Sequence, residues 1–251
     1  MSSIAICSIV FACVFGGAML GMFMRAVLPQ HHLSSDSKDV VKLGMGIVAT
    51  LSALVLGLLI DSAKGSYDAQ TSELTQMSAK IILLDRLLAH YGPETKETRD
   101  LVRRSVVRIL DQTWSKRPAG VSPPGAPSSG AEILLDKIQE LAPKDDRQRA
   151  LQGQAQGIVL DLGQMRWLQY AQMSTSISMP LLVVLVFWLT TIFISFGLFA
   201  PANATVFTGL LVAALSVSAA ILLIMELYTP YSGLIQISSA PLRDALTQLG
   251  R

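Results

Sequence analysis

Residues whose types can do chemistry are few in this chain, and they lie far apart. Two of the three histidines, His31 and His32, are adjacent. Adjacent imidazoles can bind a metal ion, but no neighbouring cysteine or acid completes an obvious ligand spacing. His90 falls near the expected end of a helix, where a histidine caps the helix or faces water. Cys7 and Cys13 lie six residues apart in an apolar stretch, on different faces of a helix, which indicates packing and not a disulfide or a metal site.

The sequence also offers no pairing of a nucleophile with a base, and no glycine-rich phosphate loop following a strand. Its densest basic cluster is the row formed by Arg99, Arg103, Arg104 and Arg108. Such a row can attract anions towards a pore mouth, or it can be the solvated face of a helix. The net charge is only +2, so there is no general case for nucleic-acid binding. We therefore expect no enzyme, cofactor, metal or nucleic-acid partner.

The composition explains why reactive residues are scarce. Hydrophobic residues make up 51% of the 251 residues and charged residues only 15%, whereas soluble domains carry about a quarter. The deficit of charge is concentrated in four stretches, which are 4–24, 43–60, 180–200 and 206–225. Each is long enough to cross the roughly 30 Å hydrocarbon core of a bilayer as a helix. We expect the first to be a span and not a signal peptide, because no lysine or arginine precedes it and its apolar run is too long.

These stretches predict an all-α membrane protein with four transmembrane helices in two pairs and a helical extramembrane domain between the pairs. The expected divisions are a first helix pair at 1–62, a soluble helical domain at 63–178, a second pair at 179–227 and a C-terminal tail at 228–251. An even number of spans places both termini and the middle domain on one side of the membrane. Positive charges near the span ends do not decide which side that is.

The middle domain is expected to contain four helices. A stripe of apolar residues at three- and four-residue spacing predicts that the helix of the second span continues to Tyr91, where Gly92 and Pro93 end it. Further helices are predicted at 94–116, at 129–141 and from 143 into the third span. The proline- and glycine-rich segment 117–130 is predicted to be a flexible surface loop.

Small residues recur at four-residue spacing inside the spans. They are Gly17 and Gly21 in the first span, Ala49, Ala53 and Gly57 in the second, and Gly209 and Ala213 in the fourth. Small side chains let two helices approach closely in lipid, where the hydrophobic drive between helices is missing. The sequence leaves open whether the partner helix belongs to the same chain or to a second copy.

The spans carry no lysine, arginine or histidine in their apolar centres. Charges inside a membrane usually mark proton or ion relays, so their absence argues against a proton-coupled transporter. A pore narrowed by apolar side chains fits this pattern, and so do plain membrane anchors. Asp61 and Glu226 stand at span ends, where each can line a pore mouth or face the lipid headgroups.

Several short segments resemble known sequences. The run 51–57, ending in Gly57 and followed by Ser66-Tyr67-Asp68, resembles the second span of bestrophins. Segments 230–233 and 240–244 resemble the elements after the last bestrophin span. A bacterial family of four-span bestrophin-like proteins of unknown function is more similar still, on the segments 46–51, 84–88 and 91–94. This resemblance covers most of the chain in its layout.

The resemblance implies a homo-oligomer, a pentamer as in bestrophins, that passes small inorganic ions and above all anions. It places the narrow neck on Thr50, Leu54 and Leu58, which share one helical face, with Asp61 at the mouth; ordinary bundle packing is the other explanation of that face. It also implies a bacterial inner membrane, with the middle domain and both termini in the cytoplasm. The acidic calcium ligands of bestrophins are missing at Ile235, Gln236 and Ser238, so calcium gating is not expected.

A second class of function stays open beside the channel. The same layout suits a membrane-anchored interaction or sensing protein that transports nothing. The bilayer is a partner under either hypothesis. The number of subunits, and the direction in which Thr50, Leu54 and Leu58 face, separate the two.

Overall fold

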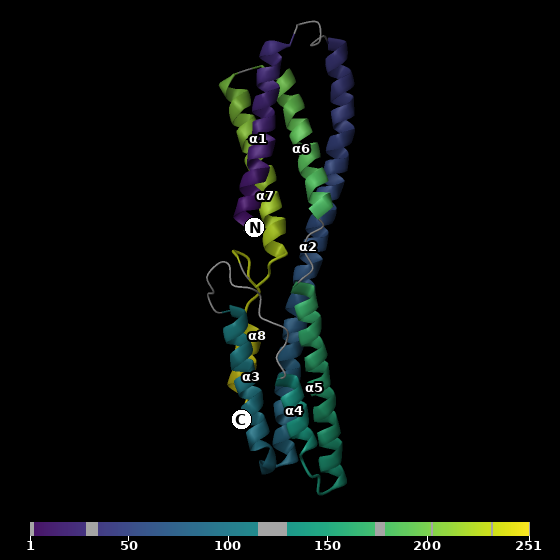
Figure 1. Cartoon of the computed structure of the whole chain (residues 1–251), viewed down its shortest axis with the longest axis vertical. Coiled ribbons are helices and arrows are strands. Elements are labelled where there is room, and N and C mark those ends of the chain that lie inside the picture. The colour runs from purple at the N-terminus through teal and green to yellow at the C-terminus, as the bar shows by residue number, and fades with distance from the viewer. Residues whose placement is uncertain are drawn as a thin grey trace. The chain divides into compact units, whose positions relative to one another are not determined.

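The structure is a computed structural model, and it describes residues 3–28, 35–114, 130–173, 179–201, 203–231 and 233–250. These residues form helices and no strand (Figure 1). The elements are α1 (Ser3–Val27), α2 (Ser35–Tyr91), the short 3-10 helix η2 (Pro93–Thr95), α3 (Lys96–Trp114), α4 (Gly130–Gln139), α5 (Asp146–Met173), α6 (Met179–Phe199), α7 (Ala204–Leu227) and α8 (Ala240–Gln248).

Four of these helices are long and apolar enough to cross a membrane. They are α1, the Lys38–Tyr91 part of α2, α6 and α7, as the charge-poor stretches predicted. The all-helical class and the presence of four candidate spans are therefore confirmed. The histidine pair 31–32 and the joint between α5 and α6 lie outside the described residues, as does the predicted loop 117–130 apart from Gly130, the first residue of α4.

The chain divides into two compact units. Unit 1 consists of Met1–Ser66 and Ser176–Thr229, and unit 2 of Tyr67–Thr175 and Pro230–Arg251. The first part of α2 therefore belongs to unit 1 and the remainder to unit 2. The residues from Pro230 onwards, which lie in the predicted C-terminal tail at 228–251, are part of unit 2.

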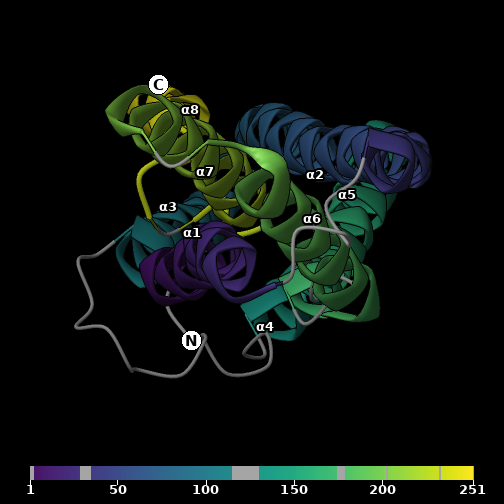
Figure 2. The ribbon, with the colours of Figure 1, turned by 90° about the horizontal axis from the view of Figure 1, so that it is seen from above.

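The core of unit 1 lies where α1 packs against α6 and α7 (Figures 1 and 2). Its fully buried side chains include Val14 and Ala18 of α1, Leu185 of α6 and Ile221 of α7. Close approach of α1 to α6 depends on glycines of both helices. A Cβ atom at Gly21 would lie 2.1 Å from the carbonyl oxygen of Ile194, far inside contact distance.

The contact between α1 and α6 is reciprocal. A Cβ atom at Gly197 of α6 would lie 2.1 Å from the carbonyl oxygen of Ala18. Gly17 lies one turn before Gly21, with its Cβ position 3.0 Å from Cγ2 of Thr190. The side chain of Arg25 hydrogen-bonds the carbonyl oxygen of Ala200 and so satisfies one of the free carbonyls at the end of α6. The backbones of α1 and α6 are therefore in direct contact at this crossing. A side chain larger than that of glycine at Gly21 or Gly197 would force the two helices apart.

The core of unit 2 is built on the predicted apolar stripe of α2. Leu84 and Leu88 are fully buried there, together with residues of α3, α4, α5 and α8, namely Val106, Ile138, Val159 and Leu242. At the end of α2, Gly92 has φ +145°, a conformation that favours glycine, and Pro93 begins η2. The predicted end of this long helix is therefore the observed one.

The last residues of the chain are anchored by side-chain and backbone contacts within unit 2. Leu242 and Ala245 of α8 are fully buried, and Leu249 is nearly so. The indole nitrogen of Trp114 donates to the carbonyl oxygen of Ile237 at 2.8 Å, and the amide of Ile237 donates to the carbonyl oxygen of Pro230 at 2.8 Å. The residues after the last span are therefore an integral part of a helical core.

Candidate functional site

The predicted pore residues occupy the outward face of α2 in unit 1. Thr50, Leu54, Leu58 and Asp61 are all exposed, with 63% of Leu54 and 70% of Leu58 accessible. The buried residues of the same segment are Ser52, Leu59 and Ala63. At about 100° per residue, these two sets lie on opposite sides of the helix. The predicted face therefore points away from the other helices of unit 1.

The apolar part of α2 is also the least packed of the four candidate spans. In its most apolar stretch, 11% of residues are buried within the chain, compared with 33% for α1, 39% for α6 and 44% for α7. The exposed stripe extends beyond the predicted neck through Leu43 and Ile47, which are 74% and 66% accessible. A surface of this kind is suited to lipid or to a neighbouring subunit.

The small residues at four-residue spacing fall into two environments. Gly17 and Gly21 are buried against α6 of the same chain. Ala49, Ala53 and Gly57 are exposed on α2, and a Cβ atom at Gly57 would meet nothing within 4 Å. The spacing alone therefore does not tell which helices are in contact, because the same pattern serves packed and open faces.

Two hydroxyl groups in the apolar part of α2 are satisfied by the helix itself. Thr50 Oγ1 donates to the carbonyl oxygen of Gly46 at 3.0 Å, and Ser52 Oγ donates to that of Val48 at 2.8 Å. Such back-bonding hides the polar atom from its surroundings. The outward face of α2 is consequently apolar from Leu43 to Leu58, and Asp61 is the first charged residue after this stretch.

The two acids at span ends have different environments. Asp61 is exposed, whereas Glu226 of α7 is only 5% accessible. Close to Glu226 in sequence, the hydroxyl of Tyr228 donates to Ser62 Oγ at 3.0 Å and so ties the end of α7 to α2. Asp61 is thus available to solutes, while the carboxylate of Glu226 is enclosed by protein.

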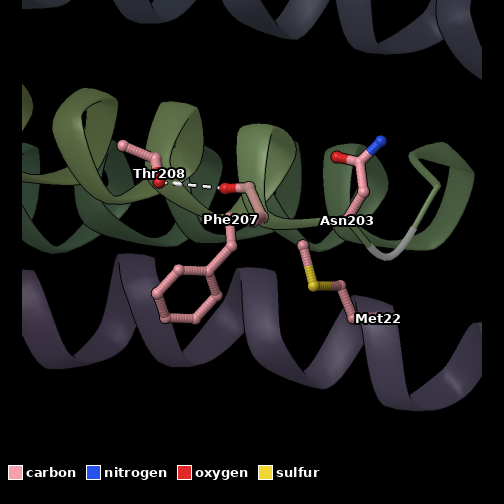
Figure 3. A pocket seen from close by; sticks show the side chains of 5 residues that line it. Met22, Asn203, Phe207 and Thr208 are labelled. Atoms are coloured by element: carbon pink, nitrogen blue, oxygen red, sulfur yellow. Dashed lines mark hydrogen bonds between the residues drawn. The ribbon is translucent and has the colours of Figure 1, made fainter.

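A hollow of about 450 Å³ opens beside the start of α7. It is lined by Met22 of α1 and by Asn203, Ala204, Phe207 and Thr208 (Figure 3). The hydroxyl of Thr208 donates to the carbonyl oxygen of Ala204, and Asn203 Oδ1 accepts the amide of Val206 at 2.9 Å. The described residues of its lining include no titratable side chain.

Unit 2 contains a buried ion pair that sequence reasoning missed. Asp85 of α2 is 1% accessible, and Arg99 of α3 donates to it twice, at 2.8 Å from Nε and 2.9 Å from Nη2. The amide of Gly250 donates to the same carboxylate at 3.2 Å. Burial on its own raises the pKa of Asp85, but the hydrogen bonds and the nearby positive charges bring it below its ordinary value.

Of the arginine row, Arg99 is therefore a structural partner of Asp85, whereas Arg103, Arg104 and Arg108 are exposed. The signal for this pairing was present in the sequence. Asp85 and Arg99 flank the Gly92-Pro93 turn, and a turn between two helices brings residues on either side of it together.

A second polar group in unit 2 joins α5 to the residues after α7. Nη1 of Arg166 donates to Oε1 of Gln169 at 2.8 Å, and Nε2 of Gln169 donates to the hydroxyl of Tyr231 at 2.6 Å. The rings of Tyr231 and Trp114 meet edge to face, with centroids 5.7 Å apart. Sequence spacing gives no hint of this group, because Gln169 and Tyr231 lie 62 residues apart.

Within the described part of the chain, no three histidine, cysteine, aspartate or glutamate residues come together in a way that could hold a metal ion. The cysteines are separate, with Cys13 exposed and Cys7 donating to the carbonyl oxygen of Ser218 at 3.3 Å.

The fold shows the general class of protein to which this chain belongs. Four apolar helices of spanning length, in a chain without a strand in its described residues, make this a membrane-embedded helical protein. A family model, the bestrophin-like domain, matches residues 12–242, so the chain belongs to the bestrophin-like family. The predicted resemblance is therefore confirmed. No curated protein and no solved structure matches the chain.

Proposed function

We propose that this chain is one subunit of a homo-oligomeric ion channel that passes small inorganic ions, anions foremost, and that α2 lines the conducting path. Membership of the bestrophin-like family supports the class of function. The observation that carries the proposal is the outward face of α2. Thr50, Leu54 and Leu58 lie opposite the stripe by which α2 packs on its own chain, so a central axis can be surrounded by these residues without breaking that packing.

The proposed mechanism is an apolar constriction. Leu54 and Leu58 of several subunits form a collar too apolar to hold water continuously, and ions pass when the collar wets. Thr50 does not interrupt the collar, because its hydroxyl is engaged by Gly46 of the same helix. Asp61 follows the collar as an exposed charge at the mouth.

The remaining organisation is proposed with it. The spans are arranged as two pairs with a helical extramembrane domain between them. The protein lies in a bacterial inner membrane, with that domain and both termini in the cytoplasm. The assembly is a pentamer, as the resemblance to bestrophins implies, and the chain has no enzymatic activity.

The first test is the oligomeric mass of the full-length protein in detergent, measured by multi-angle light scattering and corrected for bound detergent. The expected result is a closed oligomer, with five subunits if the resemblance to bestrophins holds. A monomer or a dimer would exclude the channel, because neither surrounds a central path with copies of α2. Such a result would favour a membrane-anchored interaction or sensing protein.

Conductance is the second test. Purified oligomer in planar bilayers is expected to carry a current whose reversal potential follows the chloride gradient. An oligomer that carries no current under any gradient would point to the interaction or sensing role. In that case the exposed face of α2 is a surface for assembly only.

A further inference from the structure

Arg166 of α5 is a cation that has no carboxylate partner among the described residues. It is partly buried, and its hydrogen bond in the described residues goes to the neutral oxygen of Gln169. Every aspartate and glutamate of unit 2 lies in the described part of the chain, and none of them forms an ion pair with Arg166. Its environment therefore differs from that of Arg99, which has Asp85 as a partner.

Such an arginine is costly for the fold. Burial lowers the pKa of Arg166, and no carboxylate raises it again. A guanidinium stays protonated at neutral pH even so, so the charge is retained and its loss of water must be compensated. The oxygen of Gln169 accepts one of the five N–H donors and supplies no negative charge. A bound anion would supply hydrogen-bond acceptors for the remaining N–H donors, and it would also supply the missing negative charge.

Gln169 orients the hydroxyl of Tyr231 as a second donor beside Arg166. Gln169 must direct its oxygen to Arg166, so its nitrogen faces Tyr231 and donates to the hydroxyl at 2.6 Å. That bond uses the oxygen of Tyr231 as acceptor and leaves its O–H free to donate elsewhere. Burial raises the pKa of Tyr231, with a smaller upward effect from Glu73 and downward effects from Gln169 and Arg166, so the hydroxyl keeps its proton.

The donors are also held in place and reachable. Trp114 packs edge to face on the ring of Tyr231 and donates to Ile237, which fixes the residues after α7. Among the described residues, the hydroxyl of Tyr91 is the one side-chain polar atom that is buried without a partner. The unused nitrogens of Arg166 are therefore not fully buried, so an anion can approach them from solvent.

We propose that Arg166, Gln169 and Tyr231 form a binding site in unit 2 for a small oxyanion of the phosphate class. The free edge formed by Nε and Nη2 of Arg166 presents two parallel N–H groups, which match two oxygens of one anion. The hydroxyl of Tyr231 is a third donor. Anion binding at this site does not require the protein to conduct ions. The proposed site and the proposed channel can therefore be tested independently.

Thermal unfolding of the full-length protein in uncharged detergent tests the site. Sodium phosphate is titrated against sodium chloride at constant ionic strength. The wild type is expected to show a saturable rise in Tm with phosphate that chloride does not reproduce. Arg166→Gln removes that saturable rise, while Arg103→Gln, which removes an exposed arginine of α3, keeps it. An equal phosphate response in wild type and Arg166→Gln would overturn the proposal.

Two milder variants keep the test decisive if Arg166→Gln does not fold. Tyr231→Phe preserves the ring against Trp114 and loses one donor, so the apparent phosphate affinity falls severalfold. Arg166→Lys keeps the charge but loses the paired N–H groups, so its affinity falls as well. Unchanged affinity in both variants would also overturn the site.

A further experiment with lipid distinguishes free phosphate from a lipid headgroup phosphate as the bound anion. Phosphatidylglycerol is added to the detergent in place of free phosphate, in wild type and in Arg166→Gln. A rise in Tm that depends on Arg166 with the lipid, and not with free phosphate, assigns the site to a headgroup phosphate. A wild type whose Tm responds to neither probe refutes the site.

Discussion

Arg99 clasps the carboxylate of Asp85 with two parallel hydrogen bonds, and the amide of Gly250 adds a third from the far end of the chain. The three groups lie on α2, on α3 and beyond α8. The first and last parts of unit 2 are therefore joined at one buried charge. Because both ionic groups are largely withdrawn from water, the pair is sensitive to the loss of either partner.

Replacing the acid tests this junction. Asp85→Asn leaves Arg99 partly buried without its charge partner, so we expect the free energy of unfolding to fall by about 3 kcal/mol. Removing an exposed ion pair is the matched control, and Lys80→Met, which loses the pair with Asp161, should cost no more than about 1 kcal/mol. Chemical unfolding of both variants measures the difference. Equal effects would mean that Asp85 contributes no more than a surface charge.

Low pH should weaken the same interaction between Asp85, Arg99 and Gly250. The folded-state pKa of Asp85 lies below its ordinary value, so the carboxylate stabilises the fold above the unfolded pKa of about 3.9. That stabilisation is lost as the pH falls through the folded-state pKa. We expect Tm of the wild type to fall below about pH 4 more steeply than that of Asp85→Asn. Parallel Tm curves for the two proteins would contradict the assignment.

The crossing of α1 and α6 gives a second test with a control on the same helix. Gly21→Ala puts a methyl group 2.1 Å from the carbonyl oxygen of Ile194, so the helices must separate. We expect a loss of about 1–3 kcal/mol of stability. Gly16→Ala is the control, because a Cβ atom there meets nothing within 4 Å. Thermal unfolding in detergent compares the two, and a Gly21→Ala protein as stable as Gly16→Ala would show that the contact is not tight.

The outward face of α2 gives a functional prediction. If Leu54 narrows the path, Leu54→Ala removes part of the apolar collar and raises single-channel conductance. Leu215→Ala is the control, since Leu215 is an exposed leucine of α7, 51% accessible, away from the proposed path. Currents through planar bilayers provide the measurement. If neither variant changes the conductance, Leu54 does not line the conducting path.

The C-terminal residues can be tested by two leucines of one segment. Leu242 of α8 is fully buried in the core of unit 2, whereas Leu234 is 79% accessible. Leu242→Ala is expected to cost about 2–5 kcal/mol and Leu234→Ala almost nothing. Urea unfolding measures both, followed by tryptophan fluorescence in a background where Trp167 and Trp188 are replaced by phenylalanine, so that Trp114 of unit 2 gives the signal. A small effect of Leu242→Ala would mean that α8 is only loosely attached.

The local periodicity of apolar residues in the sequence predicted most of the helices. The stripe from Leu74 to Leu88 and the Gly92-Pro93 stop determined the end of α2 correctly, because both signals are local. The shared face of Thr50, Leu54 and Leu58 also follows from spacing alone. What that face meets does not follow, because the periodicity of one chain contains no information about lipid or other subunits.

Contacts between segments that are distant in the chain could not be predicted from the sequence. Gly197 carries no four-residue repeat, yet it faces Ala18 as closely as Gly21 faces Ile194. Leu242 lies in a helix too short to show a clear period, so its segment was predicted as a tail. Gln169 and Tyr231 meet only because α5 and the residues after α7 pack together, which is a property of tertiary structure.

The contact of α1 with α6 also has a consequence for biosynthesis. Arg25 and Ala200, which meet at the end of this crossing, are separated by 175 residues. A ribosome that adds roughly 5–20 residues per second needs about 9–35 s to make the intervening chain. During that interval the glycine face of α1 lacks α6, the helix against which Gly17 and Gly21 are buried in the finished fold. Another surface, such as lipid, α2 or the membrane insertion machinery, must meet this face until α6 is made.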